Sequence, residues 1–187
     1  SVAHSYLRTF ERARAEHASR RRTEFRASTL ATRPAELPEV NLDHVEVMSD
    51  ATGMLQHAVF NVPRYDEGYC IDDNARALLL MTLLEDAGTD DAHTVRTLAS
   101  RYLAFVNHAF DATRGRFRNF MSYSRLWQEE EGSEDSHGRA LWALGTVVGR
   151  SHDPGRNSLA AALFHAALPA VSRFSSPRAF SGFMLPP

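Results

Sequence analysis

The sequence predicts an all-α protein built from helical hairpins that stack around an axis. Two observations lead to this prediction. Predicted helices with an apolar stripe on one side alternate with predicted helices that are apolar on nearly every side, and long irregular stretches precede the latter. A motif of acidic residues followed by arginine and alanine recurs where these apolar helices begin. An array with apolar helices inside and one-sided helices outside satisfies both observations.

The composition is that of an ordinary soluble globular protein. The chain has 187 residues, of which 43% are hydrophobic and 24% are charged, enough for one domain or one domain with an appendage. No apolar run approaches the roughly 20 residues that cross a bilayer, and the first residues lack the pattern of a signal peptide. Cys70 is the single cysteine, so an internal disulfide is excluded. We expect a cytoplasmic protein without a membrane span.

The charge is unevenly distributed along the chain. Residues 1–40 contain eight Arg and five Glu, a net charge of +3, whereas residues 41–187 contain thirteen Arg and eighteen acids, a net charge of −5. A basic arm on an acidic body is a weak indication of nucleic-acid binding. The body has no basic face, and the arm has no aromatic residue near its arginine cluster except Phe25. Nucleic-acid binding is therefore a minor alternative, and we expect no nucleic-acid partner.

The N-terminal segment, residues 1–27, is predicted to be one amphipathic helix. Tyr6 and Phe10 recur at helical spacing, and charged residues occupy the other faces. The apolar stripe needs a partner surface. Residues 28–40 lack periodicity and contain two prolines, which is typical of a linker, so the predicted helical module covers residues 41–187.

The module opens with a short helix and a long irregular segment. The short helix is predicted at residues 42–48, with Asn41 as its N-cap. The segment 54–71 has no helical period and contains a proline. Irregular stretches of this length inside a compact domain are usually functional. This one leads directly to a helix start at Asp72 and Asp73.

The remaining helices continue the alternation of apolar and one-sided patterns. Their predicted ranges are 72–85 and 135–148 for the apolar helices, and 91–110 and 158–174 for the one-sided helices. Gly88 and the segment 152–157 are predicted helix breakers. In the second long irregular stretch, the alternation of Phe117, Phe120 and Tyr123 allows a short hairpin.

The acidic helix start is repeated. Residues 72–78 match residues 135–141 when the segments are aligned on their arginines, Arg76 and Arg139. Residues 176–180 form a third, shorter copy, with a proline in the first turn of a last predicted helix. Capping requires one acid for each helix, whereas the first two copies have two acids each.

Three blocks carry a family resemblance: GMLQHAVFNVPRYDEGYCIDDNARALLL, FRNFMSYSRLWQEEEGSEDSHGRALWALG and SSPRAF. Together they resemble the C-terminal helical module of certain bacterial glycosyltransferases that have two Rossmann domains and are family 4-like. That module is similar to the six-hairpin (α/α)6 toroid glycosidases. The resemblance covers residues 42–180 and implies an incomplete (α/α) toroid of helical hairpins. Residues 2–13 resemble the last helix of such a glycosyltransferase, which implies a glycosyltransferase domain in the same full-length chain.

The resemblance also implies that the ring is unfinished. A six-hairpin ring has about twice as many helices as are predicted after the linker. A half ring would expose a broad apolar flank, which is a liability unless something covers it. We therefore expect this chain to be a fragment or to self-associate through the open edge of the ring.

Catalytic residues follow from the same resemblance. In toroid glycosidases, acids in the first turns of the inner helices face the sugar, which assigns four acids to one site: Asp72, Asp73, Glu134 and Asp135. Glycoside hydrolysis requires one protonated and one ionised carboxyl group, and crowding carboxyl groups together separates their pKa values. Acids at a helix start also serve as caps and interact favourably with the helix dipole, so a structural role stays open.

Other residues are candidates for substrate binding because their side chains suit sugars. Amides offer paired donors and acceptors, histidines bind hydroxyls or relay protons, and aromatic rings stack on a pyranose face. The candidates are Gln56, His57, Tyr69, Asn74, Arg76, Trp127, His137 and Arg139. Structural alternatives stay open: the arginines suit a clamp on the acid one turn earlier, and the histidines and aromatic residues suit hydrogen bonding or packing in a core.

We expect neither a metal nor a cofactor. The histidines are scattered, without an HExxH or CxxC motif, and no glycine-rich phosphate loop is present. The glycan or sugar ligand and the glycosyltransferase domain are thus the expected partners.

Two hypotheses about function remain. In the first, the module is carbohydrate-active and processes or binds a glycan, as a glycoside-hydrolase-like enzyme if it is catalytic. In the second, it is a non-catalytic scaffold or interface domain that positions the acceptor for the transferase. Carboxyl groups roughly 5 to 10 Å apart around an open cleft would favour hydrolysis. Acids turned onto Arg76 and Arg139 would argue against it.

Overall fold

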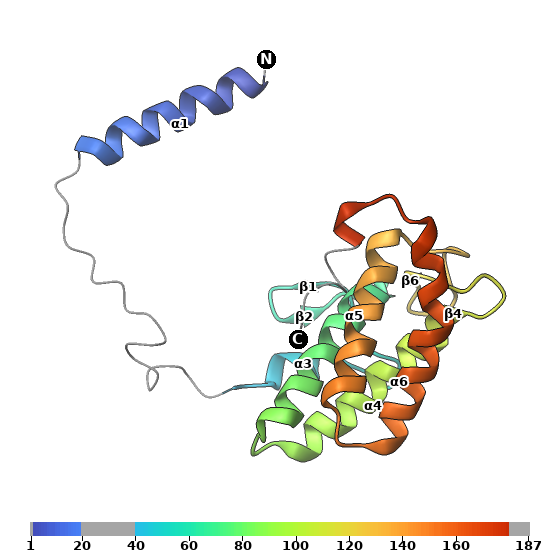
Figure 1. Ribbon diagram of the computed structural model, residues 1–187. Helices are drawn as coiled ribbons and strands as arrows, with labels where there is room; N and C mark the ends of the chain where they lie inside the picture. The colour runs from blue at the N-terminus through green and yellow to red at the C-terminus, as the bar shows by residue number, and fades with distance from the viewer. Residues whose placement is uncertain (1, 20–39, 180–187) are drawn as a thin grey trace. The chain divides into compact units, whose positions relative to one another are not determined.

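The computed structural model describes residues 2–19 and 40–179 (Figure 1). The chain divides into two compact units, with the boundary between Val40 and Asn41. The predicted helical residues 20–27, the linker as far as residue 39 and the rest of the last predicted helix lie outside the described residues. The described part is mostly helical, which confirms the helical class in its coarse form.

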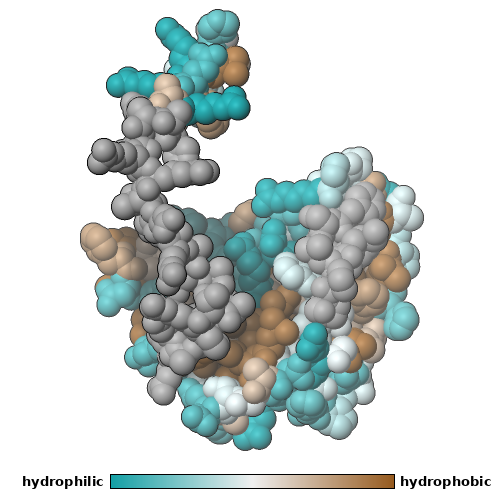
Figure 2. Space-filling view, turned by 60° about the vertical axis from the view of Figure 1, so that its left-hand side comes forward, coloured by the Kyte–Doolittle hydropathy of each residue, from teal (hydrophilic) through white to brown (hydrophobic). Residues whose placement is uncertain are grey.

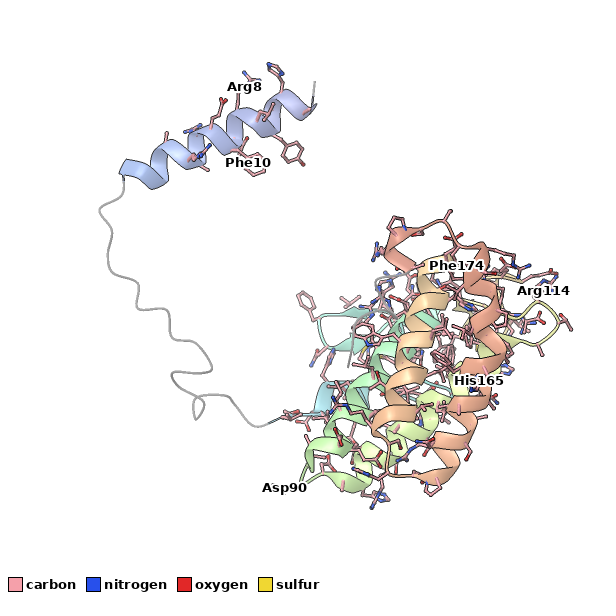
Figure 3. All side chains as sticks on the ribbon, viewed as in Figure 1. Arg8, Phe10, Asp90, Arg114, His165 and Phe174 are labelled. Carbon is pink, nitrogen blue, oxygen red and sulfur yellow. The ribbon has the colours of Figure 1, made fainter. Side chains whose placement is uncertain are left out.

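The first unit contains helix α1 (Val2–Ser19), which confirms the predicted helix over these residues. Figure 3 shows Arg8 and Phe10 projecting from different sides of this helix. Tyr6, Leu7 and Phe10 are all more than half exposed, so the apolar stripe predicted from their spacing is accessible in this unit.

The second unit is built around two helical hairpins (Figure 1). The helices are α3 (Ile71–Ala87) and α4 (Ala92–Ala109) in the first hairpin, and α5 (Glu134–Arg150) and α6 (Pro154–Ala167) in the second. α3 packs against α4 and α5, and α5 also packs against α6. The two helices that begin with acids are therefore neighbours, and α4 and α6 cover them.

The sequence of α3 explains how it packs against α4 and α5, although Leu80 and Leu83 remain exposed. After Arg76 the helix is almost entirely apolar, and Leu78 and Met81 are completely buried. Gly88 adopts a left-handed conformation, with φ of 74°, and its N–H donates to the carbonyl of Glu85. Glycine tolerates this conformation without a Cβ clash, so the predicted helix end at Gly88 is confirmed.

Short strands and turns gather at the end of the helices where α3 and α5 begin, while Asp90 marks the opposite end (Figures 1 and 3). These elements are β1 (Ala58–Val59), β2 (Val62–Pro63), η2 (Tyr65–Glu67), β3 (Tyr69–Cys70), β4 (Phe110–Asp111), β5 (Arg116–Phe117), β6 (Phe120–Met121) and η3 (Leu168–Arg173). The short helix α2 (Asp43–Val47) lies instead beside the first half of α4, where Glu46 lines a surface pocket with His93 and Thr94. All three strand pairs are antiparallel: β1 with β2, β3 with β6, and β4 with β5.

The short hairpin that the alternation around residues 117–123 allows is present, because Met121 forms an antiparallel bridge with Trp127 and the N–H of Ser122 donates to the carbonyl of Leu126. Phe117 pairs with Phe110, whereas Phe120 pairs with Cys70 from the first irregular stretch. The alternation therefore reflects real strands, and β6 pairs both with Trp127 nearby and with β3 from the first irregular stretch. The β3–β6 ribbon thus joins the two irregular stretches next to the start of α3.

Gly68 permits this ribbon to form. Its φ is 65°, and a Cβ at this position would lie 2.2 Å from the carbonyl oxygen of Met121. Every other residue type would be both strained and in collision with the backbone. Glycine is therefore required where the first irregular stretch enters β3.

The break predicted at residues 152–157 is present, because α5 ends at Arg150, but α6 already starts at Pro154 rather than at residue 158. Asp153 is the N-cap, and its side chain accepts a hydrogen bond of 2.8 Å from the backbone N–H of Arg156. Pro154 follows as the first helical residue, where its missing N–H is no loss. The helix ends at Ala167, and the 3-10 helix η3 occupies the rest of the predicted range.

The last predicted helix begins as expected, with helical residues 177–179. Its first described turn packs against α5, since Ala179 is buried and its carbonyl oxygen would lie 2.4 Å from a Cβ added to Gly138. Among the helices that the structure describes, none combines the length and apolar content that a membrane crossing requires.

Candidate functional site

The two acidic helix starts are not capped by their acids. The N-cap of α3 is Cys70, whose sulfur accepts from the backbone N–H of Asp73 at 3.4 Å. The N-cap of α5 is Ser133, whose Oγ accepts from the N–H of Ser136 at 3.0 Å. The carboxyl groups are therefore available for other contacts, and capping does not explain why each helix begins with two acids.

The second helical residue of each start is an aspartate held between two arginines. Asp72 forms ion pairs with Arg76 of its own helix and with Arg139 of α5. Asp135 forms ion pairs with Arg139 of its own helix at 3.5 Å and with Arg178 at 3.3 Å. Arg139 of the second copy thus contacts the aspartate of the first copy, and Arg178 of the third copy contacts the aspartate of the second. The clamp suggested by the sequence spacing is present, and it also links consecutive copies of the motif.

Asp73 has a different environment from Asp72. The thiol of Cys70 donates to its Oδ2 at 3.0 Å, and Arg76 lies 3.5 Å from its Oδ1. Burial, together with the charge of Asp73, raises the pKa of the Cys70 thiol well above its usual value. Cys70 is therefore held as a protonated, unreactive donor at this helix start.

Glu134 does not join the other three acids. Its Oε2 accepts hydrogen bonds from the backbone N–H groups of Ser175 and Ser176, at 3.0 and 2.7 Å. It therefore anchors the segment that leads into the third copy of the motif. These hydrogen bonds explain why α5 has Glu134 in addition to Asp135, without a role for Glu134 in ligand binding.

An open pocket of about 340 Å³ lies between the starts of α3 and α5. We call it the acidic pocket, and its lining residues are Gln56, His57, Cys70, Asp72, Asp73, Arg76, Asn119, Phe120, Ser133, Asp135 and Ser136. The structure thus brings together six of the residues predicted from the sequence. Figure 2 shows a hollowed face of this unit on which hydrophilic and hydrophobic surfaces adjoin.

Two amide oxygens in the acidic pocket are left without a hydrogen-bond partner among the described residues. They are Oε1 of Gln56 and Oδ1 of Asn119, and both atoms are buried. A buried acceptor without a partner is unfavourable by about 1–3 kcal/mol. Because neither oxygen is accessible from the pocket, Gln56 and Asn119 line it through their other atoms.

The rim that carries Asn119 is held by a residue that the sequence did not indicate. Glu129 Oε1 accepts from the backbone N–H groups of Asn119 and Phe120, at 2.6 and 3.1 Å. The backbone N–H of Ile71 donates to the carbonyl of Asn119 at 2.9 Å. The backbone of Asn119 is therefore fixed from both sides at the rim of the pocket.

The fourth helical residue of each start is completely buried and fixes the preceding irregular stretch. The amide of Asn74 accepts from the N–H of Met54 at 2.8 Å and donates to the carbonyls of Met54 and Cys70 at 3.1 and 2.9 Å. Asn74 therefore does not contact the pocket. It positions the segment that carries Gln56 and His57.

His137 occupies the corresponding place in α5. Its Nδ1 accepts from the N–H of Phe117 at 3.4 Å, and its Nε2 lies 3.1 Å from the carbonyl of Ala167, an arrangement that requires the neutral ring. Burial lowers the pKa of His137 to about 4, and the charge of Arg116 acts in the same direction. His137 is completely buried, so it is a core residue and cannot contact a sugar.

Two aromatic candidates also lie outside the acidic pocket. Tyr69 is buried, and its hydroxyl donates to Oδ2 of Asp50 at 2.5 Å. Trp127 packs against Phe105 and His108, with ring centroids 5.8 and 5.4 Å apart. The aromatic residue that does line the acidic pocket is Phe120, which is 38% exposed. Its place in the alternating pattern was the only signal in the sequence.

The arrangement can bind a polar ligand. It combines carboxylates, an arginine and two amide side chains around an open volume. Within the described ranges, no group of three or more His, Cys, Asp or Glu side chains is placed to hold a metal ion. A comparison with known protein families finds no match, and a comparison with curated proteins finds none either.

Proposed function

We propose that the helical unit binds a glycan in the acidic pocket without hydrolysing it. The observation that carries this proposal is the open acidic pocket itself, in which the carboxylates of Asp72 and Asp73 lie beside Arg76 and Phe120. A sugar offers several hydroxyl donors on one rigid ring, which suits such a set of acceptors. The exposed part of Phe120 supplies an apolar surface for the face of the ring.

Binding fits the geometry better than hydrolysis does. Hydrolysis requires one carboxyl group to carry a proton for the leaving oxygen. Asp72 and Asp135 each pair with two guanidinium groups, which are permanently charged donors. Neither aspartate is arranged as the protonated acid, and Glu134 is engaged with the backbone of residues 175 and 176.

A non-catalytic glycan-binding unit agrees with the resemblance to glycosyltransferase modules. We propose that it holds an acceptor glycan for a glycosyltransferase domain in the same full-length chain. The support for this step is the resemblance of the sequence blocks, together with the acidic pocket at the helix starts.

The proposal is tested by titrating the chain with gluco- and manno-oligosaccharides in isothermal calorimetry. Gln56→Ala is the most informative variant, because the side-chain oxygen of Gln56 has no partner to lose. We expect affinity to fall about tenfold while the unfolding free energy stays within about 0.5 kcal/mol of the wild type. Gln128→Ala, an exposed glutamine outside the pocket, is the matched control and should bind normally.

Two outcomes would contradict the proposal. One is the absence of heat from any oligosaccharide with the wild-type chain. The other is equal affinity of the wild type and Gln56→Ala for every oligosaccharide that binds. Release of reducing ends during a long incubation with the wild type would show that the unit is hydrolytic and would refute the non-catalytic part alone.

A further inference from the structure

A second pocket lies on the other side of the β3–β6 ribbon. We call it the tyrosine pocket, and it has a volume of about 280 Å³ and is lined by Asp50, Tyr69, Tyr123, Ser124 and Arg125. Successive strand side chains point to opposite faces of a ribbon. Tyr69 accordingly lines the tyrosine pocket, and its neighbour Cys70 lines the acidic pocket. One two-stranded ribbon therefore forms a wall of both pockets.

The tyrosine pocket contains opposite charges that do not pair with each other. Asp50 accepts from the N–H groups of Thr52 and Gly53 and from the hydroxyl of Tyr69, which occupies three of its roughly four acceptor positions. The guanidinium of Arg125 forms neither an ion pair nor a side-chain hydrogen bond within the described part of the chain. The pocket thus offers one open acceptor position and several open donors.

Arg125 is held in a strained conformation by its own loop. Its φ is 63°, and its N–H donates to the carbonyl of Ser122 at 2.9 Å. The loop closes through Ser122, whose N–H donates to the carbonyl of Leu126 and whose Oγ accepts from the N–H of Leu126. Left-handed φ costs a residue other than glycine about 1–2 kcal/mol. A strained residue that presents an unused charge to a pocket indicates a function.

Tyrosine rings form the apolar side of this pocket. Tyr123 stacks on Tyr65 with ring centroids 4.6 Å apart, and each ring remains about half exposed. Tyr123 also lies over Tyr69 at 6.4 Å. The exposed part of Tyr123 therefore adjoins the charged groups of the pocket.

We propose that the tyrosine pocket is a separate saccharide-binding site. A pyranose has neighbouring hydroxyls that can donate to Asp50 and accept from Arg125, and its apolar face fits the exposed part of Tyr123. An inorganic anion would use Arg125 but would meet the charge of Asp50, so the pocket favours a neutral, hydroxylated ring. This site goes beyond the proposed function of the acidic pocket and does not depend on it.

The test is a nuclear magnetic resonance titration of the whole chain with gluco- and manno-oligosaccharides, read at the backbone amides of residues 123–125. We expect these resonances to shift. Arg125→Gly removes the guanidinium and the strain together, so it should weaken binding at this site about tenfold without lowering stability. Phe60→Gly is the matched control, because Phe60 has φ of 56° but does not line the pocket. It should bind as the wild type does.

The outcomes separate the two sites. Unshifted resonances at residues 123–125 with every oligosaccharide, or equal binding by Arg125→Gly and the wild type, overturn the tyrosine site. A response of these residues to inorganic phosphate alone also overturns it, in favour of an anion site. In Gln56→Ala the shifts at residues 123–125 should persist, and their loss would show that there is one site rather than two.

Discussion

The starts of α3 and α5 are built alike but have different surroundings. In each, the residue before the helix is the cap, the second residue is an arginine-paired aspartate and the fourth residue is a buried polar side chain that binds backbone. The start of α3 is open to solvent through the half-exposed Arg76. The start of α5 is covered by residues 175–179, through Glu134 and Gly138.

This difference shows what a repeated motif does and does not specify. The motif sets the cap, the aspartate and the arginine, so consecutive copies pack with the same ion pairs. The acidic pocket lies between the first and second copies, because the irregular stretches before them supply Gln56 and Asn119. The motif therefore fixes how the two helix starts pack, and the irregular stretches before them supply the residues that complete the pocket.

The largest effect is expected from removing the buried amide of the first copy. Asn74→Ala leaves the backbone groups of Met54 and the carbonyl of Cys70 without their partner. We expect a loss of about 3 kcal/mol in unfolding free energy, measured by urea denaturation, together with weaker glycan binding. Asn157→Ala removes one exposed hydrogen bond and should cost less than about 1 kcal/mol. Equal losses in the two variants would show that Asn74 does not hold the stretch that carries Gln56.

The corresponding residue of the second copy makes stability depend on pH. His137 has a pKa of about 4 in the folded chain, lowered by burial, against 6.5 as its ordinary value. The unfolded chain therefore binds more protons between these values, and stability falls as the pH drops from 6.5 to 4. The loss reaches about 3 kcal/mol near the lower limit.

Denaturant titrations of the wild type and His137→Gln at a series of pH values test this dependence. The difference in unfolding free energy between the two proteins should shrink steadily over the acid window, because glutamine does not titrate. A difference that stays constant with pH would mean that His137 is not buried as the neutral ring. Asn74, which occupies the matching place in α3, contributes no such dependence.

The smallest losses of stability are expected from replacing the arginines of the motif. The loss should be larger for Arg139 than for Arg76. Arg139 is 20% exposed and joins two copies through Asp72 and Asp135, whereas Arg76 is 55% exposed and contacts acids of its own helix. Arg139→Gln should cost about 2 kcal/mol and Arg76→Gln about 0.5 kcal/mol, measured by thermal unfolding. A loss as large for Arg76 as for Arg139 would contradict the view that the link between copies is the stabilising contact.

Much of the helical framework could be predicted because its signals are local. The apolar run after Arg76 and the glycine at position 88 defined α3 closely, and the repeat around Arg139 defined α5. The start of α6 was missed because Pro154 was taken as a breaker, although proline suits the first position of a helix. Among the strands, only β5 and β6 are indicated by alternation, at Phe117 and Phe120, since two-residue strands carry almost no periodic signal.

The candidate site was predictable only in part. Asp72, Asp73, Asp135, Gln56 and His57 were found from the motif and the stretch before it, and all of them line the acidic pocket. Asn119 and Glu129 were missed because their roles depend on backbone contacts rather than on a pattern. His137 and Tyr69 were chosen for side-chain chemistry, but the sequence alone does not show that packing takes both of them away from solvent.

The sequence by itself determined the helices and the repeated acidic starts, because helical periodicity, capping and the spacing of acid and arginine act within a few residues. Only the tertiary structure decided which groups face one another. The pairing of β3 with β6, the reach of Arg139 to Asp72 and the burial of His137 join residues far apart in the chain. Such contacts depend on how the hairpins pack, which local pattern does not encode.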